Sequence, residues 1–260
     1  MLIFNKSNSQ KILFLKDQAK NLILDILFPY HCIHCYQESK NILCSECLKM
    51  IPLLSEFTCP NCQKTMANFS HHCYQKNNYL SSLGAASFYE NEILKKAIFA
   101  FKYQPIKEAY LPLSEKMILF LKNSSFFDYL LKSSREDLVV APIPLHQKKE
   151  KQRGFNQSDL LAQEIAQEFS LFYQKDLLTR IKNNSPQANI NNPLERKQNV
   201  SNIFQVNKKY LKENSQNNFL KSKIILLVDD VFTTGATLNE AAKVLKQNGA
   251  KKIVGLVLAK

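Results

Sequence analysis

The sequence predicts an α/β protein in which a parallel sheet with flanking helices follows a small cysteine-rich module. Two observations lead to this fold class. Near the C-terminus, apolar runs at 223–231 and 252–258 flank a helical stripe at 238–248. A strand–helix–strand unit with a right-handed crossover places its two strands parallel in one sheet. All seven cysteines lie between Cys32 and Cys73, in a region whose few apolar residues call for a metal-stabilised core.

Three parts follow from this division. We expect an amphipathic N-terminal helix at 1–29, a zinc-binding module at 30–80 and the larger sheet domain at 81–260. Helical spacing joins Ile12, Leu15, Ala19 and Leu22. This stripe indicates docking on the protein itself or on a partner, with peripheral attachment to the inner membrane as the alternative. Charged residues interrupt it, so the segment predicts neither a signal-peptide core nor a membrane span.

The charge balance favours polyanionic partners. The chain carries 35 Lys and Arg against 22 Asp and Glu, a formal charge of +13, which suits nucleic acid, an anionic surface or phosphorylated small molecules. The alternative is that an Asn-, Lys- and Ile-rich composition reflects an AT-rich genome rather than a binding role.

Two cysteine pairs have the spacing of a zinc ribbon. Cys32-x2-Cys35 and Cys44-x2-Cys47 supply four thiolates, enough for a closed tetrahedral site for structural zinc. Because no segment directs export, we expect a reducing cytoplasm, in which clustered cysteines bind metal rather than form disulfides.

A third pair predicts a second metal site. Cys59-x2-Cys62 and Cys73 supply three further thiolates, and either His71 or His72 is expected to complete the set. The alternative is a degenerate ribbon whose cysteines are reduced and unliganded.

The segment 224–238, IILLVDDVFTTGATL, indicates an anion site between a strand and a helix. Thr237 is expected to cap the helix, with Glu240 completing a capping box. The helix N-terminus directs backbone N–H groups and the positive end of its dipole toward a bound phosphate. Gly235 permits close approach of that phosphate, and threonine hydroxyls add donors. The predicted phosphate-binding residues are Thr233, Thr234, Gly235, Ala236 and Thr237.

Two acids end the same strand. Asp229 and Asp230 would repel phosphate, so their expected ligands are the two hydroxyls of a ribose, with a bridging Mg²⁺. We therefore assign both as the candidate catalytic residues of a site for a ribose 5-phosphate. The alternative is a generic strand-to-helix turn with two solvent-facing acids.

An upstream segment repeats the order strand, turn and helix. An apolar run at 138–144 is followed by a Lys-rich loop, with a helix expected at 157–169. Arg153 offers a planar guanidinium for phosphate oxygens, and Gly154 permits a turn. The loop is a candidate pyrophosphate site, although Lys-rich loops are also common on solvated surfaces.

These motifs carry a family resemblance. The run ILLVDDVFTTGATL matches the phosphoribosyl pyrophosphate (PRPP) signature of type I phosphoribosyltransferases. With PIPLHQKKEKQRGFNQ and the cysteine module, the whole chain resembles the ComF (ComFC) family of competence proteins. The resemblance implies a type I phosphoribosyltransferase-like sheet after a zinc-ribbon module. It also implies PRPP with Mg²⁺ on Asp229, Asp230 and 233–237, and pyrophosphate near Arg153, Gly154, Asn156 and Gln157.

By the same resemblance, the protein would handle incoming single-stranded DNA in natural transformation, with other DNA-uptake proteins as further partners. The alternative is an active phosphoribosyltransferase of nucleotide salvage or repair. Two features depart from the family pattern. Where family members often have a second basic residue and a Thr ahead of the Gln, this chain reads Arg180-Ile181-Lys182-Asn183-Asn184-Ser185, and it has seven cysteines where relatives often have eight.

Basic residues beside aromatic ones are candidate contacts for a single strand, through backbone attraction and base stacking. For each candidate, the alternative is an ordinary solvated surface without a DNA contact. A further possibility is that the zinc module serves as a docking site for another protein. The candidates are Lys102 with Tyr103, Lys148–Phe155, and Lys208 and Lys209 with Tyr210.

Overall fold

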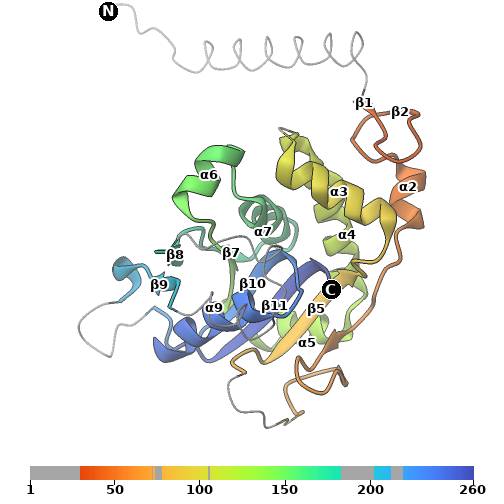
Figure 1. Ribbon diagram of the computed structural model, residues 1–260. Coiled ribbons are helices and arrows are strands. Elements are labelled where there is room, and N and C mark those ends of the chain that lie inside the picture. Colours follow the sequence, from red (N-terminus) through yellow and green to blue (C-terminus); the bar gives the residue numbers. More distant parts are fainter. Residues whose placement is uncertain (1–29, 72, 74–77, 105, 183–201, 212–218) are drawn as a thin grey trace, which may run out of the picture.

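A seven-stranded mixed sheet forms the centre of the computed structural model (Figure 1). The structure describes residues 30–71, 73, 78–104, 106–182, 202–211 and 219–260. The helix predicted for 1–29 and the candidate ligand His72 lie outside these residues, as does most of the polar excursion predicted for 182–220. Within the part of the chain so described, no helix is long and apolar enough to cross a membrane.

Five neighbouring strands of the sheet are parallel, and a hairpin extends one edge. In spatial order the parallel strands are β5 (Ser82–Ser87), β11 (Lys252–Ala259), β10 (Ile224–Val231), β6 (Leu138–Pro142) and β7 (Phe172–Tyr173). The antiparallel hairpin of β3 (Phe57–Thr58) and β4 (Thr65–Met66) lies beside β5. A mostly parallel sheet flanked by helices confirms the predicted fold class.

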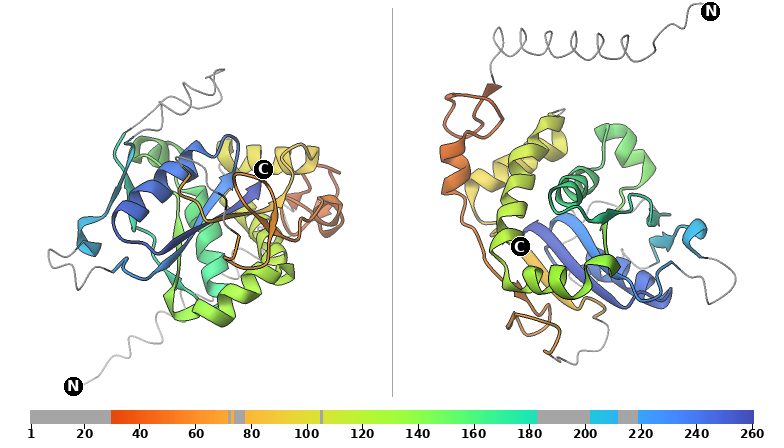
Figure 2. Two further views of the ribbon diagram at one scale, coloured as in Figure 1. Left: turned by 90° about the horizontal axis from the view of Figure 1, so that it is seen from below. Right: turned by 180° about the vertical axis from the view of Figure 1, so that it is seen from behind.

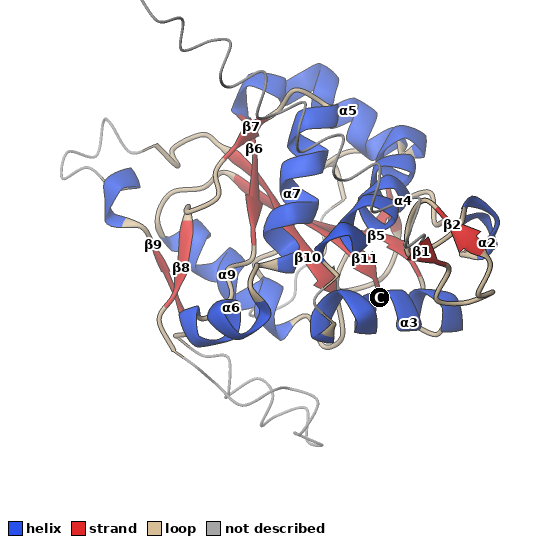
Figure 3. Ribbon diagram, turned by 90° about the horizontal axis from the view of Figure 1, so that it is seen from above, coloured by secondary structure: helices blue, strands red, loops and turns tan. Residues whose placement is uncertain are grey.

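Helices cover both faces of the sheet, as the views in Figures 2 and 3 show. One face carries α4 (Tyr110–Asn123), α5 (Ser125–Ser134) and α7 (Gln157–Glu168), with α3 (Glu92–Tyr103) packed on the same core. The other face carries α9 (Ala236–Gln247) and the ribbon of β8 (Leu178–Arg180) and β9 (Phe204–Val206). Short 3-10 turns lie at Lys107–Ala109, Arg135–Asp137 and Lys208–Tyr210.

The central strand β10 contributes buried side chains to a hydrophobic core on each face of the sheet. Leu226 and Val228 are buried on the α7 face, while Ile225 and Leu227 are buried on the α9 face. Alternate side chains of a strand point to opposite faces, so a strand covered on both sides becomes a continuous apolar run. This is the run that the sequence shows.

Strand β5 and helix α5 were not predicted. The β5 sequence, SLGAAS, has few large apolar residues, yet all six are buried. A Cβ on Gly84 would lie 2.6 Å from the Phe57 ring and 2.8 Å from the Phe120 ring. The strand is therefore built of small residues because aromatic rings pack closely over it.

The cysteine-rich region packs directly on the sheet domain. Its first half contains β1 (Tyr30–His31), β2 (Glu38–Ser39) and α2 (Ser45–Met50). The buried ammonium of Lys116 on α4 donates to the carbonyls of Leu48 and Ile51 at the end of α2, at 3.3 and 2.5 Å. In the second half, Thr58 of β3 pairs with Leu83 of β5, so this half forms the edge of the main sheet.

The connections place a crevice between β6 and β10. From β6 the chain passes through α6 (Gln147–Arg153) and α7 to β7, and α7 lies on one face. From β10 it passes through α9, on the other face, to β11. The two connections leave neighbouring strands in opposite directions. Ligands of open α/β sheets bind at such a switch point, outside the carboxyl ends of the strands.

Candidate functional site

The predicted phosphate seat lies at the carboxyl end of β10. A small pocket is formed there by residues 229, 231–233 and 235–238. Gly235 has φ of +72°, and an added Cβ would lie 2.4 Å from the Phe232 ring, so both conformation and space require glycine. The hydroxyl of Thr234 accepts from the backbone N–H of Ala236 at 3.4 Å.

The predicted capping box at Thr237 and Glu240 is wrong. Helix α9 begins at Ala236, with Gly235 as its cap and no side-chain cap hydrogen bond. The left-handed Gly235 turns the chain into the helix before Thr237 is reached. A carboxylate oxygen of Glu240 instead accepts from the backbone N–H of Asn202, at 2.8 Å. The side chain of Glu240, which was predicted to cap the helix, thus binds a segment that is distant in the sequence.

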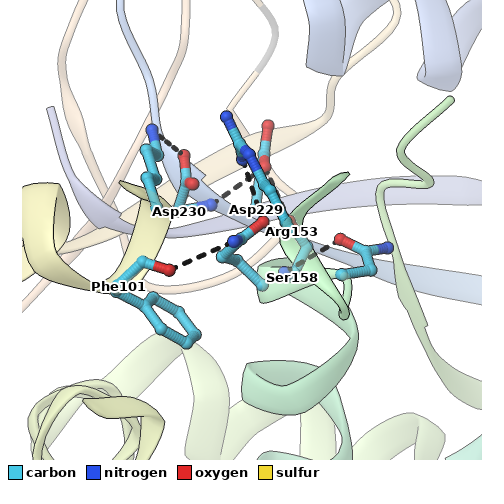
Figure 4. A network of polar contacts seen from close by, with 8 residues as sticks. Phe101, Arg153, Ser158, Asp229 and Asp230 are labelled. Atoms are coloured by element: carbon cyan, nitrogen blue, oxygen red, sulfur yellow. Dashed lines mark hydrogen bonds and ion pairs between the residues drawn. The ribbon is translucent and has the colours of Figure 1, made fainter. Parts of the chain in front are cut away.

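The two acids of β10 have separate partners, drawn in Figure 4. Asp229 accepts from the hydroxyl of Ser158 at 2.8 Å and from the backbone N–H of Asp230 at 2.9 Å. Asp230 forms an ion pair with Lys102 of α3, with 2.9 Å between Nζ and Oδ1. The carboxylates therefore stand side by side at the crevice, each linked to a different helix of the α7 face.

The electrostatics of this pair differ between its members. Burial and the charge of Asp230 raise the pKa of Asp229 to about 7, while Ser158 and Lys102 act in the opposite direction. Burial opposes the charge of Lys102, but the attraction and hydrogen bond of Asp230 outweigh it and raise the pKa of Lys102. Asp229 consequently titrates near neutrality, whereas Lys102 stays charged.

The segment after β6 was predicted to be a loop. In the structure, part of it forms the short helix α6. The His146 ring accepts from the N–H of Lys148 at 3.3 Å, which starts the helix, and Gly154, with φ of +83°, ends it. Arg153 donates to Gln157 at 3.0 Å, and Gln157 donates to the carbonyl of Phe101 at 3.1 Å. These bonds place Arg153 beside the acidic pair (Figure 4).

Three cations converge near this point. Burial lowers the pKa of Lys149, and the charges of Arg180 and Arg153 lower it further. Burial also lowers the pKa of Arg180, with Asp229 opposing the shift. An anion bound between these cations offsets their repulsion. The arrangement is thus suited to a ligand with several negative charges.

The structure brings together most of the predicted site residues. Asp229, Asp230, Arg153 and Gln157 lie around the crevice, next to the seat at 233–237. The side chain of Asn156 caps α7 through the N–H of Ser158 and donates to the Ile143 carbonyl at 3.0 Å, and its contact with a ligand stays a prediction.

Three residues of the site were not predicted in this role. The sequence gives only a weak indication that Ser158 belongs to the site, namely a hydroxyl at the start of a helix that follows a basic segment. Lys102 is a predicted DNA contact, yet its side chain is largely buried and paired with Asp230. Lys149 is one of several lysines in the predicted loop, and only the fold separates it from them.

The cysteines form the two predicted groups. The sulfur atoms of Cys32, Cys35, Cys44 and Cys47 lie within 4.8 Å of one another, as do the ligand atoms of Cys59, Cys62, His71 and Cys73. Within the described ranges all seven cysteines are free. Since His72 lies outside them, the structure shows the geometry of His71 alone.

Both groups fit tetrahedral zinc. Two thiolates at about 2.3 Å from Zn²⁺ lie about 3.8 Å apart, and a thiolate and an imidazole nitrogen about 3.6 Å apart. The sulfurs of Cys35 and Cys44 are separated by 3.7 Å, and the sulfur of Cys62 and the Nε2 of His71 by 3.2 Å. The donor types and their spacing are those that zinc prefers.

The loops at 32–37 and 59–64, called the first and second zinc knuckles below, repeat one backbone hydrogen-bond pattern. Cys32 N–H donates to the Gln37 carbonyl and Tyr36 N–H to the Cys32 carbonyl, at 2.8 and 2.9 Å. Cys59, Lys64 and Gln63 make the equivalent bonds at the same distances. Tyr36 and Gln63 occupy the same left-handed position, with φ of +62° and +64°.

One predicted DNA contact is contradicted. Tyr210 is 9% exposed, and its hydroxyl donates to Asp176 at 2.6 Å. The ammonium of Lys209 lies 2.5 Å from the same carboxylate. A buried ring cannot stack on a base, so Tyr210 stabilises the fold rather than a bound strand.

Two family models match separate parts of the chain. Residues 158–260 match the phosphoribosyl transferase domain, and residues 23–76 match the double zinc ribbon domain. The first match covers the acidic pair and the phosphate seat. The second covers all seven cysteines.

Curated relatives match the chain over part or most of its length. The chain is 28% identical to competence protein F of Haemophilus influenzae over 233 residues, which are 87% of this chain and 95% of that protein. It is 28% identical to competence protein ComFC of Streptococcus pneumoniae over 222 residues, 81% and 84% of the two chains. DNA utilization protein YhgH of Escherichia coli K12 is 32% identical over 114 residues, 44% and 45% of the two chains.

Proposed function

Because this chain is a homologue of competence proteins F and ComFC, with a phosphoribosyl transferase domain and a double zinc ribbon, we propose that it binds PRPP with Mg²⁺ and acts in DNA uptake by handling incoming single-stranded DNA. The observation that carries the proposal is the opposition of charges across the crevice between β6 and β10. Asp229 and Asp230 lie there beside a helix N-terminus, and the charge of Asp229 acts on Arg180, whose own charge acts on Lys149 together with that of Arg153.

The acidic side suits the ribose of PRPP. Asp229 and Asp230 would accept hydrogen bonds from its two hydroxyls, and ionised carboxylates are also ligands for Mg²⁺. The 5-phosphate would occupy the seat at 233–237, where Gly235 allows close approach and the α9 dipole is favourable. Lys102 would have to share Asp230 with this ligand, since the two are paired without it.

The basic side suits pyrophosphate. Burial lowers the pKa of Lys149, and the charges of Arg180 and Arg153 lower it further, so a polyanion between the three cations relieves their repulsion. Gln157 holds Arg153 at 3.0 Å, which orients its guanidinium before the ligand arrives. If PRPP reacts, these cations would stabilise the departing pyrophosphate.

We assign zinc a structural role in both cysteine groups, because their donors form closed four-ligand sets. Purified protein should contain about two zinc ions per chain, measured by elemental analysis of material prepared without chelator. Material that is folded but free of zinc would contradict this assignment. Contacts with other DNA-uptake proteins and with the inner membrane stay predictions, since the helix expected to make the membrane contact lies outside the described residues.

Thermal unfolding tests the PRPP site. A ligand bound only to the native state stabilises it by about 2.7 kcal/mol at a hundred times its Kd, so PRPP with Mg²⁺ should raise Tm. Asp230→Asn and Thr234→Val should each reduce the rise. Asp128→Asn is the matched control, because this acid is paired with Lys132 on the exposed face of α5. Equal shifts in all four proteins would exclude the crevice as the site.

Pyrophosphate release separates binding from catalysis. Incubation with PRPP, Mg²⁺ and single-stranded DNA, or with free nucleobases, is followed by a pyrophosphate assay. Release that requires Arg153 would favour the alternative of an active phosphoribosyltransferase of salvage or repair. A rise in Tm without release is the result expected of a PRPP-binding protein.

A further inference from the structure

Exposed aromatic side chains form a strip along α3, between the first zinc knuckle and α6. Tyr36, Tyr89 and Phe99 line one groove together with Lys95 and Lys96. Tyr103 extends the row, with its ring 5.0 Å from that of Phe99. Figure 1 shows α3 beneath the loop that joins β1 and β2, with α6 beyond its far end. Tyr36, Tyr89, Phe99 and Tyr103 are called the aromatic strip below.

Packing does not account for these rings. Tyr36, Phe99 and Tyr103 are 72%, 58% and 64% exposed, although Phe is normally among the most buried residue types and Tyr is intermediate. Four of them on one contiguous face are more than the scattered exposed residues of an ordinary surface, and such faces mark interaction sites.

Tyr36 shows the cost of this arrangement most clearly. It has φ of +62°, a conformation that favours glycine, and a large side chain there is disfavoured by about 1 kcal/mol or more. Its ring is mostly exposed, so burial does not offset that cost. The equivalent position of the second knuckle carries the polar Gln63. The Tyr36 ring is therefore explained by something that it contacts from outside.

Cations accompany the strip at both ends. Lys96 is exposed at the groove, while its neighbour Lys95 is paired with Glu92 at 2.9 Å. At the other end the guanidinium of Arg153 lies 5.4 Å from the centre of the Tyr103 ring. Arg153 ends α6, whose sequence QKKEKQR has four cations and one acid. A chain of negative charges is thus favoured along this face.

We infer that the aromatic strip binds single-stranded DNA, with its bases stacked on the exposed rings and its phosphates near Lys96 and α6. The inference rests on the proposed function and adds to it the surface on which the single-stranded DNA binds. Rings with an adjacent basic path are the combination by which proteins bind single strands without reading sequence. A duplex is disfavoured, because its bases are already stacked on each other.

The strip leads to the proposed PRPP site. Lys102, between Phe99 and Tyr103 in the sequence, is paired with Asp230, and Arg153 contacts both Tyr103 and Gln157. One helix therefore presents rings to the outside and an ammonium to the crevice. A strand on the aromatic strip would have one end beside the ribose and pyrophosphate positions.

Fluorescence anisotropy with a labelled oligothymidylate tests the surface. Phe99→Ala and Tyr103→Ala should each weaken binding by roughly 5- to 150-fold, the usual effect of removing one stacking ring. Tyr36→Gly should weaken binding as well, and it leaves the knuckle intact because glycine accepts its φ. Phe172→Ala is the matched control: this ring, on β7 at the opposite edge of the sheet, is 55% exposed and outside the strip.

The outcomes separate this inference from the proposed function. If Tyr36→Gly and Phe99→Ala bind DNA as tightly as wild type, the aromatic strip is not the DNA-binding surface, while the proposed function stands. No wild-type binding at low salt would remove both DNA handling and the strip. The Tm rise with PRPP should persist in Tyr36→Gly and Phe99→Ala. Sedimentation is measured in parallel, and a wild-type dimer that Phe99→Ala dissociates would make the strip a self-association face and overturn the inference.

Discussion

At the scale of the residue, Asp229 determines how the site responds to pH. Its pKa of about 7 means that the folded protein holds a proton that the unfolded chain, with an ordinary Asp near pH 4, has lost. Ionisation therefore costs stability, and the free energy of unfolding should fall as pH rises from about 4 to 7. In Asp229→Asn this contribution disappears, so its unfolding free energy, measured by denaturant titration, should fall less over that window than that of wild type.

Asp128→Asn, on the exposed face of α5, serves as the control and should follow wild type. PRPP provides a second readout at the same residue, since Mg²⁺ and ribose hydroxyls both favour the ionised carboxylate. The Tm rise with PRPP should grow between about pH 6 and 8 in wild type. A rise that does not vary with pH would show that Asp229 is not part of the ligand site.

At the scale of the element, α2 is joined to α4 through one buried ammonium. Lys116 is 5% exposed and donates to the carbonyls of Leu48 and Ile51. Lys116→Met keeps the apolar stem but removes the donors, so the unfolding free energy should fall by about 1–3 kcal/mol. Lys122→Met, at an exposed position of the same helix, should change it by less than about 0.5 kcal/mol. Increased stability in Lys116→Met would mean that burying the charge costs more than its two hydrogen bonds return.

The two zinc ribbons should also respond differently to loss of a ligand. Cys59 follows β3, which pairs with β5 of the main sheet, whereas Cys32 lies in a loop outside that sheet. Cys59→Ser should therefore speed amide hydrogen exchange in 57–66 and at Leu83, and Cys32→Ser should leave these amides protected. Equal exchange in the two variants would contradict a structural link between the second cluster and the sheet.

At the scale of the whole molecule, the formal charge of +13 predicts DNA binding that weakens steeply with salt. The structure decides which lysines contribute. Lys148 and Lys151 are exposed on α6, so replacing both by Ala should reduce the slope of log affinity against log salt by roughly 0.7 for each phosphate that these lysines neutralise. Lys209→Ala should leave the slope unchanged, because its ammonium is neutralised by Asp176. Anisotropy titrations at several salt concentrations measure these slopes.

The sequence by itself determined the parts whose structure depends on near neighbours. The unit of β10, the Gly235 turn and α9 follows from an apolar run, a glycine and a helical stripe within 36 residues, 224–259. The knuckles follow from C-x2-C spacing, and Gly154 ends a basic segment as expected. The seat and the acids of β10 could therefore be predicted before any tertiary contact was known.

Tertiary structure alone decided which distant residues meet. Lys102 reaches Asp230 across 128 positions and Ser158 reaches Asp229 across 71, and no local pattern encodes either pair. The same holds for the β3–β4 hairpin on the edge of the sheet, for Tyr210 buried against Asp176, and for aromatic rings from two modules that share one groove. Such contacts depend on how the helices pack on the sheet, because packing sets which side chains are buried and which charges are paired.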